Sequence, residues 1–391
     1  MSAASAAKTF MGYRRANGTV GIRNHVLVLP SVMCANHVVE LIGRKVPDVV
    51  TVQHPTGCSQ VGADFEQTKR TMAGFAANPN VAAVLVVGLG CETNESKALA
   101  EEIAARGQRV EVIGIQESGG TTETIARGVA IAKQLLEEAA RHERTECPVS
   151  ALIVGTECGG SDGFSGITAN PALGCASDRV VAEGGTVILA EVPELVGAEH
   201  LLAARASEPV AAKLYELIER VEARARAMHV DMRGGNPTQG NIAGGLTTIE
   251  EKSLGAAYKG GSTELREVVE YAERPSETGL VVMDTPGQDI EQLTGMIAGG
   301  AQVVVFTTGR GTPTGSPIAP VIKVATNTAM FERMRENMDV NAGAIVDGTR
   351  TLEEVGEEIF GWIVDAANGR EPAAEELGFR DFAINRIGPS F

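Results

Sequence analysis

Short runs of Val, Ile and Leu recur along the chain, each followed by a glycine-containing turn and then by a segment with helical spacing of apolar residues. This alternation is typical of βαβ units, in which crossover helices join parallel strands. The pattern predicts eight strands of ordinary length, at residues 25–29, 49–52, 82–87, 110–115, 151–154, 186–190, 279–283 and 302–306. We therefore expect an α/β protein built on parallel sheets.

The segment at residues 136–148 is polar, contains no glycine and ends in a proline, which suits the entry to a new segment. We expect a domain boundary near residue 147, with one α/β domain at 1–147 and a larger one at 148–391. Two domains also fit a length of 391 residues. Residues 208–228 predict one long helix with Ser207 as its N-cap. The glycine-rich passage at 233–245 predicts a loop near a site.

Composition narrows the function classes. Hydrophobic residues make up 43% of the chain and charged residues 21%, which is enough apolar surface for a sizeable core. A net charge of −16 disfavours nucleic acid and anionic membranes as partners. The sequence has no apolar run of membrane-spanning length and no secretory leader, so we expect a cytoplasmic protein. An anionic substrate would need cations placed at its site.

Ligands of open parallel sheets bind beyond the carboxyl ends of the strands, which makes the residues after each predicted strand the candidates. Cys58, Cys91 and Cys158 each follow such a strand. Packing of a small apolar side chain is the alternative for any one of them. Thiolates with His54 and Glu92 nearby suit iron or zinc, and the absence of a CxxC pair argues against a zinc finger. A variant gathers the three cysteines around an iron–sulfur cluster.

Two carboxylates occupy equivalent places in the second half of the chain. Glu191 directly follows the predicted strand 186–190, where a carboxylate is typical of a metal ligand or a proton-transfer group. Asp162 lies in the sequence CGGSDGFSG that begins at Cys158. It is a candidate site residue, with a helix N-cap as the alternative interpretation.

The cations that an anionic substrate needs are found after the predicted strand 302–306, in the sequence TTGRGTPTG. Backbone N–H groups, hydroxyls and one guanidinium can converge there on a carboxylate. We expect this loop to bind substrate through Thr307, Thr308, Gly309, Arg310 and Thr312. No Walker motif and no GxGxxG fingerprint is present, which disfavours an NAD-dependent oxidoreductase. The sequence also lacks the GxSxG motif of the nucleophile elbow, which disfavours a serine hydrolase.

Long motifs across nearly the whole chain carry a family likeness. They are GYRRANGTVGIRNH (12–25), HPTGC (54–58), VVGLGCE (86–92), CGGSDGFSGITANPALG (158–174), NPTQGNIAGGLTTIEEKSLG (236–255), MDTPG (283–287) and FTTGRGTPTG with KVATNT (306–328). On these residues the chain resembles the altronate/galactarate dehydratase family, which includes the large subunit of (R)-sulfolactate sulfo-lyase. The resemblance implies an iron-activated lyase that removes water or sulfite from the β-carbon of a 2-hydroxy carboxylate. It also implies a first domain used in dimer contacts and a C-terminal variant Rossmann-like domain with a metal site.

The chain departs from the full-length dehydratases of this family, in which a small β-clip domain precedes the GYRRANG segment that here begins at residue 12. The resemblance therefore implies a separate small β-clip subunit and a homodimer of large subunits. The GTPTG loop is similar to the galactarate and sulfo-lyase enzymes, whereas DTPG is similar to the altronate and sulfo-lyase enzymes. Both leaving groups stay open.

We assign expected roles to the candidate metal-binding, substrate-binding and proton-transfer residues. We expect Fe²⁺, with Mn²⁺ or another divalent cation as alternatives, and place Cys158, Glu191, Cys58 and Cys91 among its ligands. Arg310 binds the carboxylate, Lys252 or His54 transfers protons, and Asp162 and Asn170 contact the substrate. For Lys252 and for Lys323, a solvated surface lysine is the alternative. A non-catalytic scaffold subunit is the rival interpretation of the whole chain.

Overall fold

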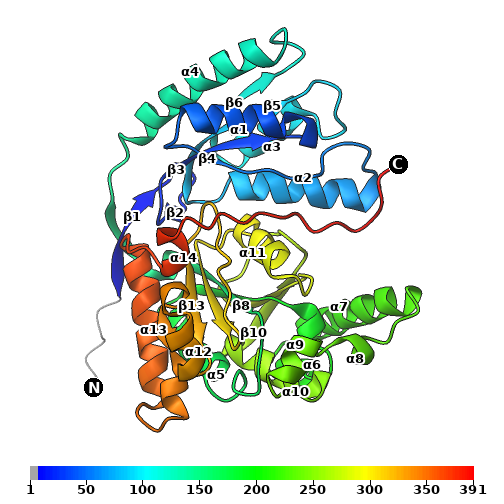
Figure 1. Cartoon of the computed structure of the whole chain (residues 1–391), viewed down its shortest axis with the longest axis vertical. Helices are drawn as coiled ribbons and strands as arrows, with labels where there is room; N and C mark the ends of the chain where they lie inside the picture. Colours follow the sequence, from blue (N-terminus) through cyan, green and yellow to red (C-terminus); the bar gives the residue numbers. More distant parts are fainter. Residues whose placement is uncertain (1–7) are drawn as a thin grey trace.

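The computed structural model describes residues 8–391 and contains two parallel sheets, which lie in the upper and lower halves of Figure 1. The upper sheet has four parallel strands in the order β4-β3-β5-β6. Its strands are β3 (His25–Pro30), β4 (Val50–Thr51), β5 (Val81–Gly88) and β6 (Arg109–Gly114). Its helices are α1 (Asn36–Lys45), α2 (Gly62–Ala76), α3 (Ser96–Ala105) and α4 (Thr121–Ala139). Helices α1 and α4 pack on one face, and α2 and α3 pack on the other.

The lower sheet has seven parallel strands in the order β10-β11-β9-β8-β12-β13-β14. They are β8 (Ile153–Cys158), β9 (Thr186–Leu189), β10 (Leu265–Val269), β11 (Gly279–Met283), β12 (Val303–Thr308), β13 (Val321–Ala325) and β14 (Val340–Asn341). Helices α5 (Ala169–Ala182) and α13 (Leu352–Ala367) cover one face, and α11 (Asp289–Ala298) covers the other. The α/β class with parallel sheets is therefore confirmed.

All eight predicted strands are present, and most are runs of buried apolar residues that a parallel sheet covered on both faces requires. Strand β6, at the edge of its sheet, is mostly half-buried. The pattern missed strands that carry charged or exposed positions. Strand β10 alternates buried and exposed residues, and Lys323 interrupts the apolar run of β13. A small antiparallel sheet, β2-β1-β7, was also missed, and it consists of β1 (Thr9–Arg14), β2 (Val20–Gly21) and β7 (Thr145–Pro148).

The predicted division at residue 147 falls inside β7, which pairs with β1 at the start of the chain. The division of the chain into domains at this residue stays a prediction. The two sheets are joined by more than this linker, because α2 and α11 pack against each other in one apolar cluster that contains residues of both sheets. Asn78 and Asn80 extend this contact by donating hydrogen bonds to carbonyls of the second half, at 2.8–3.0 Å.

A helical excursion between β9 and β10 lies at the lower right of Figure 1. It contains α6 (Glu199–Ala203), α7 (Glu208–Ala227), α8 (Met232–Gly235), α9 (Gln239–Ala243) and α10 (Ile249–Ala257). The predicted long helix is α7, and Ser207 stands at its N-cap position without making the side-chain hydrogen bond of a cap. The prediction of a loop at 233–245 was wrong in part, because the short α9 forms there under a Thr238 capping box.

The remaining elements close the structure. They are α12 (Thr328–Arg333), α14 (Ala373–Glu376) and the 3₁₀ turns η1 (Met33–Ala35), η2 (Val149–Ala151), η3 (Val192–Glu194), η4 (Tyr258–Gly260), η5 (Arg335–Asn337) and η6 (Ala342–Ile345). The C-terminal tail, residues 377–391, runs back along α2 (Figure 1). In the described part of the chain, no helix is both long and apolar enough to cross a bilayer.

Candidate active site

Two neighbouring strands of the seven-stranded sheet end at adjacent functional side chains. Cys158 is the last residue of β8, and Glu191 follows the end of β9, which pairs with β8. Glu191 has a φ of 68°, in the left-handed region, and this turn sends the chain into η3. The turn brings Glu194 back over the strand ends. All three side chains are buried, with exposed fractions of 3%, 1% and 5% in the order Cys158, Glu191, Glu194.

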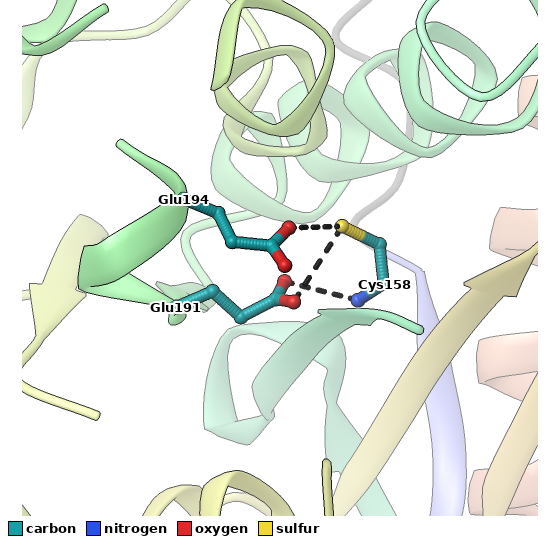
Figure 2. Close-up of side chains that lie close together, drawn as sticks. All are labelled: Cys158, Glu191 and Glu194. Carbon is teal, nitrogen blue, oxygen red and sulfur yellow. Dashed lines mark hydrogen bonds between the residues drawn. The ribbon is translucent and has the colours of Figure 1, made fainter. Parts of the chain in front are cut away.

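These three side chains form a compact group, which we refer to as the Cys158 group (Figure 2). The Cys158 sulfur lies 3.6 Å from Oε1 of Glu191 and 3.4 Å from Oε2 of Glu194. The backbone N–H of Cys158 donates to Oε2 of Glu191 at 3.0 Å. Among the described residues, this is the one set of three or more His, Cys, Asp or Glu side chains whose ligand atoms all lie within 4.8 Å of each other.

Two lysines from the helical excursion complete the arrangement. Lys259 in η4 places its ammonium 2.8 Å from the Cys158 sulfur and also contacts the Glu191 carboxylate. Lys252 in α10 lies 2.5 Å from Oε1 of Glu194 and donates to the side-chain oxygen of Asn236 at 3.0 Å. Lys259 is fully buried and Lys252 is 9% exposed, so the interpretation of Lys252 as a solvated surface lysine was wrong.

The buried charges shift one another's protonation. Burial raises the pKa of the Cys158 thiol well above its usual range, and the nearby Glu191 charge adds to the rise. Burial also raises the pKa of Glu191, against the pull of Lys259. Burial by itself would lower the pKa of Lys259, but the negative groups Cys158 and Glu191 outweigh it and raise that pKa. The group therefore holds negative ligands that are stable as anions only beside positive charge.

The donor set fits a divalent metal ion. The group offers one sulfur and two carboxylates whose ligand atoms all lie within 4.8 Å of each other, and all three side chains are buried. Iron, manganese and zinc accept such ligands. The Lys259 ammonium lies against two of the three ligands and supplies positive charge there. On β8 the residue before Cys158, Glu157, is fully buried and neither of its carboxylate oxygens has a hydrogen-bond partner among the described residues. Burial raises the pKa of Glu157 well above its usual range, which favours the neutral carboxyl group at this point.

The loop after β12 presents Arg310 to solvent. The N–H groups of Gly309 and Arg310 donate to the Gly160 carbonyl at 3.2 and 3.0 Å, which ties the loop to the segment that follows Cys158. The Arg310 side chain is exposed, and no ion pair or side-chain hydrogen bond to a described residue occupies its guanidinium. Strand β12 is paired with β8 on the side opposite β9, so Arg310 and Glu191 flank Cys158. The guanidinium is free to bind an anion.

The other predicted residues of this loop serve its architecture. The Thr307 hydroxyl donates to the Asn170 side-chain oxygen at 2.6 Å, and the Thr308 hydroxyl accepts from the Gly311 N–H at 2.9 Å. Asn170 in turn donates to the Gly255 carbonyl at 3.0 Å. The half-buried Thr312 places its hydroxyl 2.9 Å from that of Thr314. These hydrogen bonds hold the loop in place, and substrate binding by Thr307, Thr308 and Asn170 stays a prediction.

Both carboxylate oxygens of Asp162 accept hydrogen bonds from within the protein. Its Oδ2 accepts from the Thr326 hydroxyl at 2.9 Å and the Asn327 amide at 3.0 Å, while Oδ1 accepts from the Phe164 N–H and the Ser165 hydroxyl at 3.1 Å each. The carboxylate therefore ties the segment after β8 to the segment after β13. It is not the N-cap of α5, which begins at Ala169. A role in substrate contact is not supported for this residue.

Three predicted residues belong to the four-stranded sheet instead. His54 is buried, its Nε2 lies 2.7 Å from the Pro30 carbonyl, and its Nδ1 lies 2.9 Å from the Thr56 hydroxyl, so both ring nitrogens are in use. Cys58 and Cys91 are exposed thiols on the loops after β4 and β5. Among the described residues, none of the three joins the Cys158 group. The proton transfer expected of His54 and the ligation expected of Cys58 and Cys91 therefore gain no support from this geometry and stay predictions.

The comparisons with known proteins identify the family of the chain. A family model described as D-galactarate/Altronate dehydratase, C-terminal, matches residues 149–390. Another, described as D-galactarate dehydratase/Altronate hydrolase, second domain, matches residues 12–140. The chain belongs to this family. The family resemblance in the sequence motifs is thereby confirmed.

Relatives in this family are lyases. The chain is 39% identical to an altronate dehydratase of Bacillus subtilis, over 97% of this chain and 78% of the relative. It is also 39% identical to a (2R)-sulfolactate sulfo-lyase subunit beta of Chromohalobacter salexigens, over 97% and 98%. A galactarate dehydratase (L-threo-forming) of Escherichia coli is 38% identical, over 93% and 73%. The protein is therefore a lyase of the altronate/galactarate dehydratase family, and the scaffold interpretation is withdrawn.

Two central residues of this lyase escaped the sequence analysis. Glu194 lies three positions after Glu191, in EVPE, and the spacing of one turn was the available signal. Lys259 lies seven positions after Lys252, and this spacing places both lysines on one face of a helix. Neither follows a predicted strand directly, so a search confined to strand ends misses both.

Proposed function

We propose that the protein catalyses β-elimination from a small 2-hydroxy carboxylate, with a divalent metal ion held by the Cys158 group. One observation carries the proposal, namely the buried thiol and two carboxylates that meet two lysines at the carboxyl edge of a parallel sheet. Fe²⁺ is the metal we propose, with Mn²⁺ or another divalent cation as the alternative. Fe²⁺ suits a mixed sulfur and oxygen ligand set. The iron–sulfur variant loses support, because Cys58 and Cys91 stand apart from Cys158.

Each residue of the site has a distinct task in this proposal. Cys158, Glu191 and Glu194 hold the metal, and Arg310 binds the substrate carboxylate through its planar fork. A bound divalent cation supplies a Lewis acid that stabilises the negative charge developing on the carboxylate when the α-proton leaves. Arg310 also orients the α- and β-carbons toward the buried group.

Lys252 is the proton-transfer residue that we retain. Burial would lower its pKa, but the Glu194 carboxylate outweighs this effect and raises it, so that Lys252 carries a proton at neutral pH. The α-proton needs an acceptor, and Lys252 at the rim of the group can take it only after giving up its own proton, which engagement of the Glu194 carboxylate by a metal would favour. The ammonium that results can return this proton to a departing β-hydroxyl group, which leaves as water. Sulfite leaves as an anion and needs no proton, so only the return of the proton depends on the leaving group.

The name of the sulfo-lyase relative describes one subunit of a larger enzyme. We propose that this chain likewise acts with a small second subunit, and that two copies of the chain associate. The similarity to dehydratases and to the sulfo-lyase is equally strong, at 38–39% identity. The leaving group is therefore a question for experiment.

The test is an anaerobic assay with Fe²⁺ and the candidate small subunit, using D-altronate, galactarate and (R)-sulfolactate. Keto-acid and sulfite are measured together. We expect keto-acid from at least one acid, and sulfite in equal amount if sulfolactate is the substrate. The Cys158→Ser variant should abolish this activity, whereas Cys175→Ser, at a half-buried cysteine outside the group, should retain it. Inactivity of the wild type on all three acids, or an active Cys158→Ser variant, would refute the proposal.

A further inference from the structure

A cleft of about 280 Å³ lies beside the Cys158 group and takes no part in the chemistry described above. It is lined by the end of α7, the DTPG segment after β11, the middle of η3 and the C-terminal tail. Pro193, which lines the cleft, stands between Glu191 and Glu194 in the chain. Thr285, also in the lining, accepts the backbone N–H of Glu191 through its hydroxyl. The cleft and the Cys158 group therefore share a wall.

The wall formed by the tail is held in place. Arg386 binds the Asp64 carboxylate in α2, with its closest contact at 2.6 Å, and the N–H groups of Ile387 and Gly388 donate to the same carboxylate. Gln67 donates to the Asn385 carbonyl at 2.8 Å. The tail thus closes one side of the cleft from a fixed position on the first half of the chain.

The cleft has one available positive charge. Arg386 is paired with Asp64. Asp284 in the lining is paired at 2.9 Å with Arg220, which also binds Glu270, and the Arg224 charge favours the ionised form of Asp284 as well. Arg224, from the last turns of α7, lines the cleft, is exposed and forms no ion pair or hydrogen bond with any residue that the structure describes. An anion in the cleft would meet this guanidinium.

The order of the strands places the Cys158 group between the Arg310 loop and the DTPG segment, which lines the cleft together with Arg224. Arg310 follows β12, Cys158 ends β8, Glu191 follows β9, and the DTPG segment follows β11. Neighbouring strands are about 4.8 Å apart, so the backbone at the two outer positions is separated by about 14 Å. Arginine side chains reaching inward from both sides can hold the two ends of one small molecule.

Building on the proposed function, we propose that the cleft binds a second anionic group at the far end of the substrate, with Arg224 as its charge partner. The substrate is then an acid with an anion at each end. A carboxylate and a sulfonate share this chemistry. Charge-assisted pairing with a guanidinium predicts a clear preference for the acid that carries the second anion.

Binding by the full-length chain tests this, measured by calorimetry without added iron so that no turnover occurs. The probes are two matched pairs that differ in the second anion, D-galactarate with D-galactonate and (R)-sulfolactate with L-lactate, which has the same configuration at C2. The variant is Arg224→Gln. Its control is Arg226→Gln, two residues further along α7, where Arg226 is paired with Glu219 outside the cleft. Arg224→Lys keeps the charge and should restore part of the preference.

In at least one pair, we expect the wild type and Arg226→Gln to bind the acid with two anionic groups ten-fold or more tightly than the acid with one. Arg224→Gln should lose that preference, with little change in its affinity for the acid that has a single anionic group. A preference kept in Arg224→Gln, or a wild type with no preference or no binding in both pairs, would overturn the inference. Preferential binding without conversion once iron and the small subunit are added would refute the proposed function and leave the cleft assignment intact.

Discussion

Lys323 is a buried lysine that forms no ion pair with a described carboxylate. It is fully buried on β13, its ammonium donates to the Thr312 carbonyl at 3.3 Å, and it lies 6.0 Å from the centre of the Phe306 ring. Burial lowers its pKa to about 8, although the more distant Asp339 and Asp381 favour the charged form. The alternative of a solvated surface lysine was wrong for this residue as well.

The low pKa predicts a pH-dependent stability for Lys323→Met. The folded-state pKa of about 8 lies below the ordinary value of 10.5, so the unfolded chain binds more protons between these values. This residue therefore destabilises the wild type fully below pH 8, and the penalty fades as pH rises toward 10.5. We expect Lys323→Met to raise the free energy of unfolding by about 1–3 kcal/mol at pH 7. Denaturant unfolding at pH 7 and 10 should show this gain shrinking, and a gain independent of pH would contradict it.

The proposed binding of the substrate carboxylate by Arg310 can be tested by a single substitution. Replacement by Lys keeps the charge and removes the planar fork, so kcat/KM should fall about ten-fold or more while the melting temperature is unchanged. Steady-state kinetics measures this, on whichever of the three acids the protein converts. The control is Arg127→Lys, at an exposed arginine on α4. Equal kcat/KM in Arg310→Lys and wild type would remove Arg310 from the site.

At the scale of elements, the C-terminal tail depends on one carboxylate in α2. Burial would raise the pKa of Asp64, but hydrogen bonds from Arg386, Gln60 and the tail backbone outweigh it and lower that pKa to about 2. Asp64→Asn removes the charge that these donors share. We expect a loss of about 2 kcal/mol in stability and faster amide exchange at 384–391, measured by hydrogen–deuterium exchange.

The stabilisation by Asp64 also has a pH window. The folded pKa of about 2 lies below the unfolded value of 3.8, so this stability is present above pH 3.8 and is lost as pH falls from 3.8 toward 2. Asp64→Asn should show less acid destabilisation in this window than the wild type. A tail with unchanged exchange rates in Asp64→Asn would show that other contacts hold it.

The elements also explain which parts of the site the sequence could predict. Cys158 and Glu191 were found because each ends an apolar strand, and adjacent parallel strands bring such residues together. Cys58 and Cys91 satisfied the same rule but lie apart from the Cys158 group, because the chain forms two sheets and the rule does not say which edge a strand end joins. Lys259 reaches Cys158 from 101 positions away through the helical excursion, a contact that only the tertiary structure creates.

At the scale of the whole molecule, the two sheets share one apolar cluster. It contains Leu27 and Val84 of the first sheet and Ile188 and Phe306 of the second, with α2, α3 and α11 between them. The first half also has an apolar cluster of its own, and a third cluster lies mostly in the second half, but neither half can unfold without exposing the shared cluster. We expect a single cooperative thermal transition.

Gly74 tests this shared interface. A Cβ at Gly74 in α2 would lie 2.4 Å from the Ala298 carbonyl oxygen at the end of α11, and backbone cannot yield as a side chain does. We expect Gly74→Val to lower stability by about 1–3 kcal/mol and to broaden or split the transition seen by scanning calorimetry. The control is Gly361→Ala in α13, where an added Cβ meets no described atom within 4 Å and should stabilise slightly. An unchanged transition in Gly74→Val would show that the halves pack loosely.

The most direct test of the account is the Fe²⁺ dependence of keto-acid formation by protein first treated with a chelator. Wild type should be inactive after treatment and regain activity with Fe²⁺. Glu194→Gln should need at least ten-fold more Fe²⁺ for half activation, because one ligand loses its charge. Glu183→Gln, at a half-buried carboxylate after α5, is the control and should match the wild type. Full activity of the chelated wild type, or activation of Glu194→Gln at the wild-type concentration, would contradict a metal held by the Cys158 group.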